Sequence, residues 1–460
     1  MEPPSDQDEQ VTRPMRENLS LIPFRFYSFK MKHSNAPTNR LGLIAILCLS
    51  LSAGGVGLGQ APEAGPWPQW RGPTSDNHAS GDVSLPRHWD LRTGEGVAWK
   101  TKLPGRGHST PIFVSDAIFL TTADEDAGTQ SVVELDARSG KLRQEIVLHR
   151  GTLPPRIHPN NSHASPSMAY DGERLFASFH TDDAIVVTAL STDGSQLWQT
   201  RVCEFKPSSF QFGYGASPII EDNVVIVAAE YDGKDSGIYA LDRTSGKQVW
   251  KIARPQNLNF ASPIVTTIAG SRQLLIAGAE TFSAYDPLKG RLIWQVPTTT
   301  EAICGTVVWD DRHVMVSGGN PDAGTWCVAA DGTERLMWSN RVMCYEQSLL
   351  AIKNYLFAVA DNGVAYCWRT HDGKEMWKMR LFGGGISASP LLADGHVVVA
   401  TQRGEVFLYS AFPDRFESVA KIQTGDSIFA TPVAIENRLY VRTGINESGR
   451  RQEYLIAIGP

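Results

Sequence analysis

The chain has 460 residues, 42% of them hydrophobic, with 41 Gly, 27 Pro and 12 Trp. The apolar fraction is sufficient for a packed core, which excludes a disordered or fibrous protein. The 43 basic and 49 acidic residues are mixed along the chain and give a net charge of −6. No basic stripe is present, so a nucleic-acid partner is not expected. The many Gly and Pro residues favour a β-rich fold with many turns.

The first sixty residues divide into two parts. Residues 1–30 are polar and of mixed charge, whereas after Met31 basic residues precede thirteen mostly apolar residues, Leu41–Ala53, and a stretch of small residues follows. This order is typical of a secretory signal peptide. We predict that residues 31–60 are a signal peptide, that translation begins at Met31 and that residues 1–30 lie upstream of the true start. A short membrane anchor and a buried helix are the alternatives, but thirteen helical residues rise only about 20 Å against a bilayer core of about 30 Å.

A repeat covers the rest of the chain. A strand-like segment that opens with Ser or Thr followed by Pro has six clear copies, and two degenerate copies fill the long gap between the fourth and fifth. The successive spacings are 55, 52, 45, 44, 42, 41 and 42 residues. The eight copies are marked by Pro111, Pro166, Pro218, Pro263, Val307, Leu349, Pro390 and Pro432.

Each copy continues with an alternating strand, a third strand and a turn that contains Gly. The third strand and its turn are clearest in residues 238–250. We expect Tyr239, Leu241, Asp242 and Gly246 to have a structural role in this repeat unit. Four short strands every 41–55 residues describe one propeller blade. We therefore predict an all-β, eight-bladed β-propeller of four-stranded antiparallel blades. A Trp recurs after the turn that follows the third strand, and we call it the closing Trp. It is expected to pack between blades, at Trp198, Trp250, Trp294, Trp338 and Trp377.

The two ends of the repeat region complement each other. The last copy ends at residues 454–459 without a closing Trp strand, and residues 96–100 (GVAWK) resemble the missing strand. We expect this N-terminal strand to complete the C-terminal blade, which removes exposed sheet edges. Residues 96–460 then form one propeller domain, and residues 61–95 are a leading segment.

The third strand and its turn resemble the repeat YALDxxTGKxxW of bacterial pyrroloquinoline-quinone (PQQ) type propellers. Residues 239–250 match it almost letter for letter, and residues 67–73 (WPQWRGP) resemble the segment before the propeller in exported proteins of this group. The resemblance implies the same fold but two kinds of function. The group includes quinoprotein dehydrogenases, with PQQ and Ca²⁺ in a central funnel, and cofactor-free scaffolds such as the BamB-type lipoprotein, which helps to assemble outer-membrane barrels.

The cysteines bear on this choice. The dehydrogenases that the chain resembles carry a disulfide between adjacent cysteines above the quinone, and this chain has no Cys-Cys pair. We expect Cys48 to leave with the signal peptide. The others are interpreted as small buried residues, with one or two disulfide bridges as the alternative in an exported protein: Cys203, Cys304, Cys327, Cys344 and Cys367.

Function is expected where the first strands meet the central channel. The residues just before these strands are candidates to line one mouth: His108, His163, Tyr214, Phe260, Glu301, Glu346 and Phe429. Glu301 and Glu346 are also candidate Ca²⁺ ligands. The longest insertion between strands adds loop candidates for binding a metal or an anion: His149, Arg156, His158, Asn160 and Asn161. These lack the i,i+4 spacing of a helical metal pair, and a solvated loop over the propeller face is the alternative. Lys251 and Arg254 are expected at the surface.

These observations predict a non-catalytic binding or scaffold module in the periplasm or cell envelope. We expect a monomer without a cofactor or a transmembrane span in the mature chain, which holds an envelope protein or an extended peptide at its loop face or funnel mouth. The first alternative is a quinoprotein oxidoreductase that passes electrons from an alcohol or sugar to PQQ with Ca²⁺. The second is a glycan- or polymer-binding module.

Overall fold

The computed structural model describes residues 66–151, 153–209 and 211–460. The expected signal peptide and residues 1–30 lie outside the described residues. Strands and turns make up the described part, which contains no α-helix. Accordingly, no helix in these ranges is long and apolar enough to cross a membrane.

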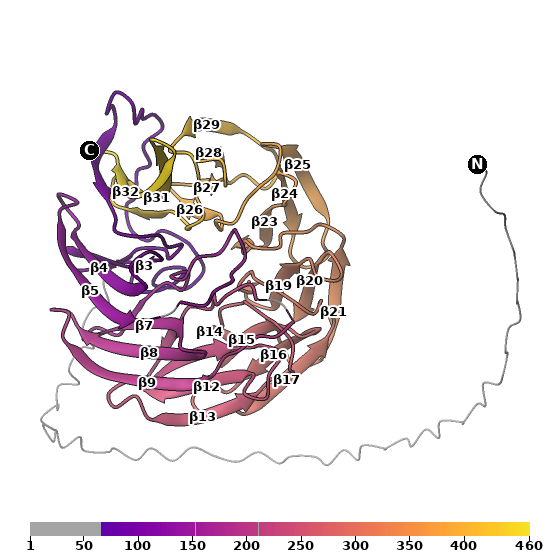
Figure 1. Ribbon diagram of the computed structural model, residues 1–460. Helices are drawn as coiled ribbons and strands as arrows, with labels where there is room; N and C mark the ends of the chain where they lie inside the picture. Colours follow the sequence, from indigo (N-terminus) through magenta and orange to yellow (C-terminus); the bar gives the residue numbers. More distant parts are fainter. Residues whose placement is uncertain (1–65, 152, 210) are drawn as a thin grey trace, which may run out of the picture. The chain divides into compact units, whose positions relative to one another are not determined.

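The strands form eight four-stranded antiparallel sheets, which are arranged as blades around a central axis (Figure 1). The first strands are β2 (Ile112–Val114), β6 (Ala169–Tyr170), β10 (Ile219–Glu221), β14 (Ile264–Ile268), β18 (Val308–Trp309), β22 (Leu350–Ile352), β26 (Leu391–Ala393) and β30 (Val433–Ile435). The second strands are β3 (Ala117–Asp124), β7 (Arg174–Thr181), β11 (Val224–Ala229), β15 (Ser271–Gly278), β19 (His313–Gly318), β23 (Tyr355–Val359), β27 (His396–Ala400) and β31 (Arg438–Glu447). The third strands are β4 (Thr129–Asp136), β8 (Ala184–Ser191), β12 (Gly237–Asp242), β16 (Thr281–Tyr285), β20 (Gly324–Ala329), β24 (Val364–Arg369), β28 (Glu405–Ser410) and β32 (Arg450–Ile458). The fourth strands are β5 (Leu142–Arg150), β9 (Gln196–Glu204), β13 (Gln248–Ala253), β17 (Leu292–Pro297), β21 (Leu336–Asn340), β25 (Glu375–Arg380), β29 (Ser418–Gln423) and β1 (Val97–Lys102).

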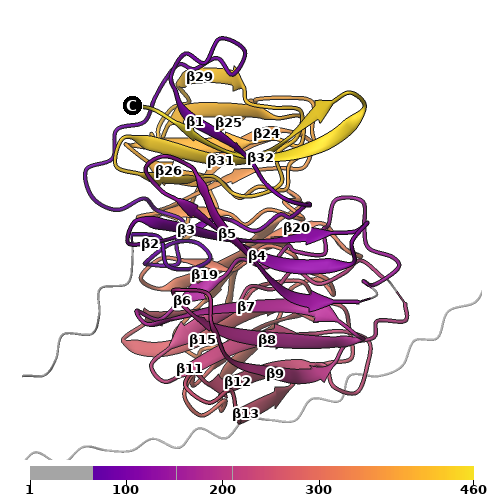
Figure 2. The same cartoon turned by 60° about the vertical axis from the view of Figure 1, so that its left-hand side comes forward.

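Strand β1 closes the ring. It pairs antiparallel with β32, so that the last blade has the order β1-β32-β31-β30 (Figure 2). Trp99 of β1 supplies the closing Trp that the last repeat lacks. The prediction of an all-β, eight-bladed propeller closed by its N-terminal strand is confirmed.

In blade 2 the first strand begins two residues later than the alignment of the repeat copies on Pro166 predicts. In every blade a Ser or Thr lies two residues before the first strand, and in blade 2 this residue is Ser167, because β6 begins at Ala169. Met168 therefore takes the place that Pro has in most other copies. The assignment of Pro166 to the repeat position was wrong, since the pair Ser165-Pro166 imitates the motif two residues early.

Four closing Trp rings each lie against a glycine of the next blade. The Trp198 indole of blade 2 lies over Gly246 of blade 3, and its Nε1 donates to the carbonyl oxygen of Arg243 at 3.0 Å. A Cβ on Gly246 would lie 2.6 Å from the Trp198 ring, and its φ of +71° also favours Gly. The same arrangement joins Trp99 to Gly140, Trp250 to Gly290 and Trp338 to Gly373.

The other motif residues of blade 3 lie in the core or in the turn. Tyr239 and Leu241 are buried on β12. One carboxylate oxygen of Asp242 accepts hydrogen bonds from the N–H and the hydroxyl of Ser245, at 2.8 and 2.7 Å. These hydrogen bonds lower the pKa of Asp242 and hold the turn that carries Gly246 under the Trp198 ring.

Arg254 corrects a sequence-based expectation. Lys251 is partly exposed, but Arg254 is buried, where it pairs with Glu230 and donates to Tyr285 Oη at 3.1 Å. A buried guanidinium is tolerated when it is paired and hydrogen-bonded. Glu230 follows β11 and Tyr285 ends β16, so the residues next to Arg254 in the sequence give no sign of them.

Candidate functional site

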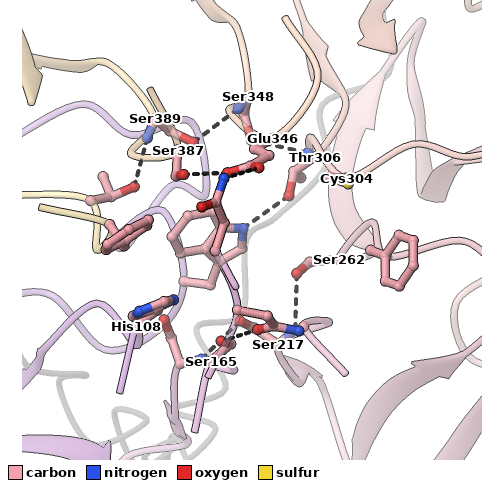
Figure 3. A pocket seen from close by; sticks show the side chains of 18 of the residues that line it. His108, Ser165, Ser217, Ser262, Cys304, Thr306, Glu346, Ser348, Ser387 and Ser389 are labelled. Atoms are coloured by element: carbon pink, nitrogen blue, oxygen red, sulfur yellow. Dashed lines mark hydrogen bonds between the residues drawn. The ribbon is translucent and has the colours of Figure 1, made fainter. Parts of the chain in front are cut away.

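A ring of eight hydroxyl side chains, one from each blade, surrounds the central axis. These residues, the hydroxyl ring, lie two positions before each first strand: Thr110, Ser167, Ser217, Ser262, Thr306, Ser348, Ser389 and Thr431. The backbone N–H groups of six of them donate to the hydroxyl of the next blade, as from Ser348 to Ser389 at 3.0 Å (Figure 3). The ring therefore satisfies buried backbone donors while it joins neighbouring blades.

A second layer of residues lies two positions before the hydroxyl ring. This mouth layer consists of His108, Ser165, Gly215, Phe260, Cys304, Glu346, Ser387 and Phe429. Together with most of the hydroxyl ring, the mouth layer lines a central cavity of about 210 Å³, which we name the funnel (Figure 3).

Four of the seven predicted mouth residues line the funnel, namely His108, Phe260, Glu346 and Phe429. The other three predicted mouth residues do not line the funnel, and their prediction is corrected. They were chosen at positions too far before the hydroxyl ring when the repeat copies were aligned with one another. Tyr214 lies three residues before the ring, His163 four and Glu301 five. Tyr214 is buried and donates to the carbonyl oxygen of Ala228, and the carbonyl oxygen of Glu301 accepts from Ala279 at 2.7 Å.

The leading segment closes the opposite end of the funnel. Its backbone carbonyl oxygens accept hydrogen bonds from first strands, at residues three positions after the hydroxyl ring. The N–H of Phe113 donates to the carbonyl oxygen of Trp67, and the N–H of Leu392 donates to the carbonyl oxygen of Asn77. Trp70 lines the funnel and donates from Nε1 to Thr306 Oγ1 at 2.9 Å. This indole forms the floor of the funnel.

Glu346 is held by a network at the mouth. Its Oε1 accepts from Asn160 Nδ2 at 2.9 Å, its Oε2 accepts from the Ser387 hydroxyl, and Gln402 Nε2 donates to Ser387 Oγ at 2.8 Å. Glu301 is absent from the funnel lining, so the two candidate Ca²⁺ ligands do not converge there. In the described ranges no group of three or more His, Cys, Asp or Glu residues is placed to hold a metal ion.

His108 and Phe429 form a stacked pair across the seam between blades 1 and 8. Their ring centroids are 4.5 Å apart and the planes differ by 11°. Burial lowers the pKa of His108 well below its usual value, and the positive charges of Arg106 and Arg442 lower it further. His108 is therefore neutral at pH 7, and the pair presents two uncharged rings to the funnel.

The long insertion folds over the funnel. His158, Asn160 and Asn161 line the funnel itself, and Asn161 Nδ2 donates to the carbonyl oxygen of Phe212 at 2.7 Å. A cavity of about 680 Å³ adjoins it, which we name the side groove. Its lining includes Arg106, Glu125, Arg156, His158, His163 and Phe212.

His149 does not belong to this loop. Strand β5 extends to Arg150, so His149 pairs with Gln130 in blade 1 and packs edge-on against Phe179, with ring centroids 5.6 Å apart. The loop assignment failed because β5 runs beyond the apolar residues Ile146–Leu148 that mark it in the sequence.

The five cysteines in the described part of the chain are all free. Cys203, Cys327 and Cys367 are buried in strands, and Cys344 is buried in the segment between β21 and β22, which agrees with their interpretation as small core residues. Cys304 lines the funnel, where burial raises the pKa of its thiol, so it is protonated at pH 7.

The sequence carried a signal for the hydroxyl ring that the alignment on Pro overlooked. Where the repeat loses its Pro, at Val307 and Leu349, it keeps the preceding Thr306 and Ser348. Counting back two residues from each such hydroxyl gives the whole mouth layer, including Ser165, Cys304 and Ser387. Nothing in the sequence indicates that Trp70 forms the floor of the funnel.

The family model described as "Outer membrane protein assembly factor BamB" matches residues 88–208, 143–379 and 350–412. The chain belongs to this family of PQQ-repeat propellers. BamB of Burkholderia pseudomallei is 21% identical over 365 residues, which cover 69% of this chain and 86% of that protein. The tetrathionate hydrolase of Acidithiobacillus ferrooxidans is 26% identical over 221 residues, 41% of this chain and 42% of the hydrolase.

Solved structures with this fold include a BamB protein and a methanol dehydrogenase. BamB from Moraxella catarrhalis superposes with a TM-score of 0.55 at 16% identity, covering 78% of this chain and 96% of that chain. A europium-containing methanol dehydrogenase superposes with a TM-score of 0.60 at 11% identity, covering 86% and 98%. At these identities the comparisons establish the fold, and the funnel residues must decide the function.

Proposed function

We propose that the protein is a non-catalytic binding module of the cell envelope that holds an extended segment of another protein at the funnel mouth. The observation that carries this proposal is the lining of the funnel, which combines aromatic rings with hydroxyl groups. The cavity of about 210 Å³ is smaller than the roughly 300–1,000 Å³ of most cofactor and ligand pockets. It suits one side chain of a docked segment. A relative named as an outer membrane protein assembly factor, and the matching family model of the same description, support a role in the envelope.

The funnel residues do not fit PQQ with calcium. A quinone with three carboxylates needs cationic partners, and among the described residues that line the funnel none is Lys or Arg. His108 is neutral. Calcium takes six to eight oxygen ligands, whereas both oxygens of Glu346 already accept hydrogen bonds from Asn160 and Ser387. These residues favour binding without redox chemistry, and we derive no quinone step.

The hydroxyl ring suits polar groups of a bound segment. An oxygen such as Ser389 Oγ accepts an N–H from the neighbouring blade and keeps its own hydrogen to donate. A peptide side chain that enters past Phe260 and Phe429 would pack against their rings and meet these donors. Under this proposal the chain is exported, acts as a monomer in the periplasm or envelope and needs no cofactor.

The experiment is a titration of the chain from residue 61 with PQQ and CaCl₂, followed by heat and quinone absorbance. A dye acceptor and a panel of alcohols and sugars are then added. We expect no saturable binding and no dye reduction. Saturable binding at micromolar concentration together with dye reduction would overturn the proposal and favour the quinoprotein alternative.

A further inference from the structure

Three arginines and one glutamate gather beside the funnel at the seam between blades 8 and 1. We define Arg106, Arg442, Arg451 and Glu453 as the arginine cluster. Glu453 Oε1 lies 3.1 Å from Arg451 Nη2 and 3.9 Å from Arg442 Nε. Two guanidinium groups pair with this one carboxylate and Arg106 adds a third positive charge, so positive charge is in excess in the cluster.

Part of this charge is buried. The side chains of Arg442 and Glu453 are 1% and 2% exposed. Arg442 Nη1 donates to Ser109 Oγ and to the carbonyl oxygen of Thr121, both at 2.8 Å, but its Nη2 has no hydrogen-bond partner among the described residues. The backbone at Gly107 packs directly against this guanidinium group. Any larger residue would clash, because a Cβ at position 107 would lie 2.3 Å from Arg442 Nη2. Buried charge without a full complement of partners attracts an opposite charge.

Arg106 connects the cluster to the side groove. Its Nη2 donates to the carbonyl oxygen of Pro159 at 3.0 Å, whereas its Nε is buried without a partner in the described part of the chain. Arg156 lines the same groove. The carboxylate that lines it, Glu125, is 57% exposed, and its ion-pair partner is His163 at 3.9 Å. The groove therefore has an excess of cationic groups.

We propose that the side groove beside Arg106 is an oxyanion site, which takes a carboxylate, phosphate or sulfate group. A guanidinium offers parallel N–H donors that match two oxygens of such a group. This inference goes beyond the proposed function, because a small oxyanion would bind here whether or not the funnel holds a protein segment. The oxyanion has two sources, a free inorganic anion or the acidic side chains of a peptide.

The test is calorimetric titration of the chain with sodium phosphate, sodium sulfate and a hexapeptide of Asp and Glu, against sodium chloride at equal ionic strength. The variant is Arg106→Gln, and the matched control is Arg92→Gln, whose side chain is 84% exposed in the leading segment. We expect saturable binding to the native chain and to the control, and at least tenfold weaker binding to Arg106→Gln. Arg106→Lys should retain part of the affinity because it keeps the charge.

Binding of phosphate or sulfate identifies a free anion as the source, and binding of the hexapeptide alone identifies carboxylates of a peptide. Both results support the site. Heat no greater than that of chloride, or equal losses in Arg106→Gln and Arg92→Gln, would overturn it. Should Arg106→Gln fail to fold, the ring signals of His108 in the native chain decide, because an anion beside Arg106 must raise the pH at which His108 titrates. An unchanged His108 titration would also overturn the proposal.

Discussion

Trp70 Nε1 donates to Thr306 Oγ1 at 2.9 Å and thereby joins the leading segment to the residues just before the first strand of blade 5, β18. The two residues are 236 positions apart in the chain. The same segment bonds to first strands of other blades through Trp67 and Asn77. Residues 67–79 thus connect blades 1, 5 and 7 at one end of the funnel, where Trp70 forms its floor.

The Trp70 floor predicts a graded loss of stability. Trp70→Ala should lower the free energy of unfolding by about 2–3 kcal/mol, because a large, partly buried ring is lost. Trp70→Phe keeps a ring but loses the hydrogen bond to Thr306, and it should cost only about 1 kcal/mol. Urea denaturation measures both. Equal losses in the two variants would show that the indole ring contributes no packing at the floor.

The hydroxyl ring gives a second prediction. Ser389→Ala should lower the free energy of unfolding by about 1–3 kcal/mol, because the N–H of Ser348 would be buried without an acceptor. Ser389→Thr should be close to the native value, since Thr431 already fills the equivalent position in blade 8. Thermal and chemical unfolding of the pair is the measurement. A stable Ser389→Ala protein would mean that water replaces the hydroxyl at no cost.

The contact between Trp198 and Gly246 predicts a difference between two glycines. Gly246→Ala and Gly332→Ala both place a side chain at positive φ, which costs about 1–2 kcal/mol. Only at Gly246 does the new Cβ collide with an indole; at Gly332 there is no atom within 4 Å. We expect Gly246→Ala to lose at least about 1 kcal/mol more, from overpacking. Similar unfolding midpoints for the two variants would show that the contact between Trp198 and Gly246 does not require glycine.

His180 predicts a dependence of stability on pH. Both of its ring nitrogens are buried without a hydrogen-bond partner in the described ranges, and burial lowers its pKa to about 4. A histidine in the unfolded chain titrates near pH 6.5, so between pH 6.5 and 4 the unfolded state binds a proton that the folded state does not. The contribution of His180 is therefore complete above pH 6.5 and is lost as the pH falls to 4, by about 1–3 kcal/mol.

The check is the difference in the free energy of unfolding between pH 7 and pH 4.5. His180→Leu should show a smaller difference than the native chain, and His88→Leu, at a side chain that is 70% exposed, is the control substitution. If His180→Leu keeps the full difference, other groups carry the acid sensitivity.

The fold was predictable because its information is local. Each blade repeats one order of strands and turns, and β1 resembles the closing strand that the last blade lacks. The exception, at Pro166, shows the limit of this approach. A Ser-Pro pair that lies two residues early satisfies the motif in the sequence, and only the pairing of β6 with β7 reveals that Ser167 holds the ring position.

The candidate site was predictable only in part. His108, Phe260, Glu346 and Phe429 could be found by counting back from the repeat, because position within a repeat fixes position around the axis. Trp70 and Arg442 could not, because their contacts join segments that are distant in sequence, and no local pattern reports such contacts.

The central claim is that the funnel mouth binds a protein segment. The most direct measurement replaces Phe429 with photoreactive benzoylphenylalanine in the cells that make the protein. The control position is Leu288, which is exposed in the turn between β16 and β17 and does not line the funnel. Crosslinked products are identified by mass spectrometry. The account predicts a discrete adduct with one protein segment at position 429 and none at position 288. The absence of a protein adduct at 429, or equal adducts at both positions, would contradict it.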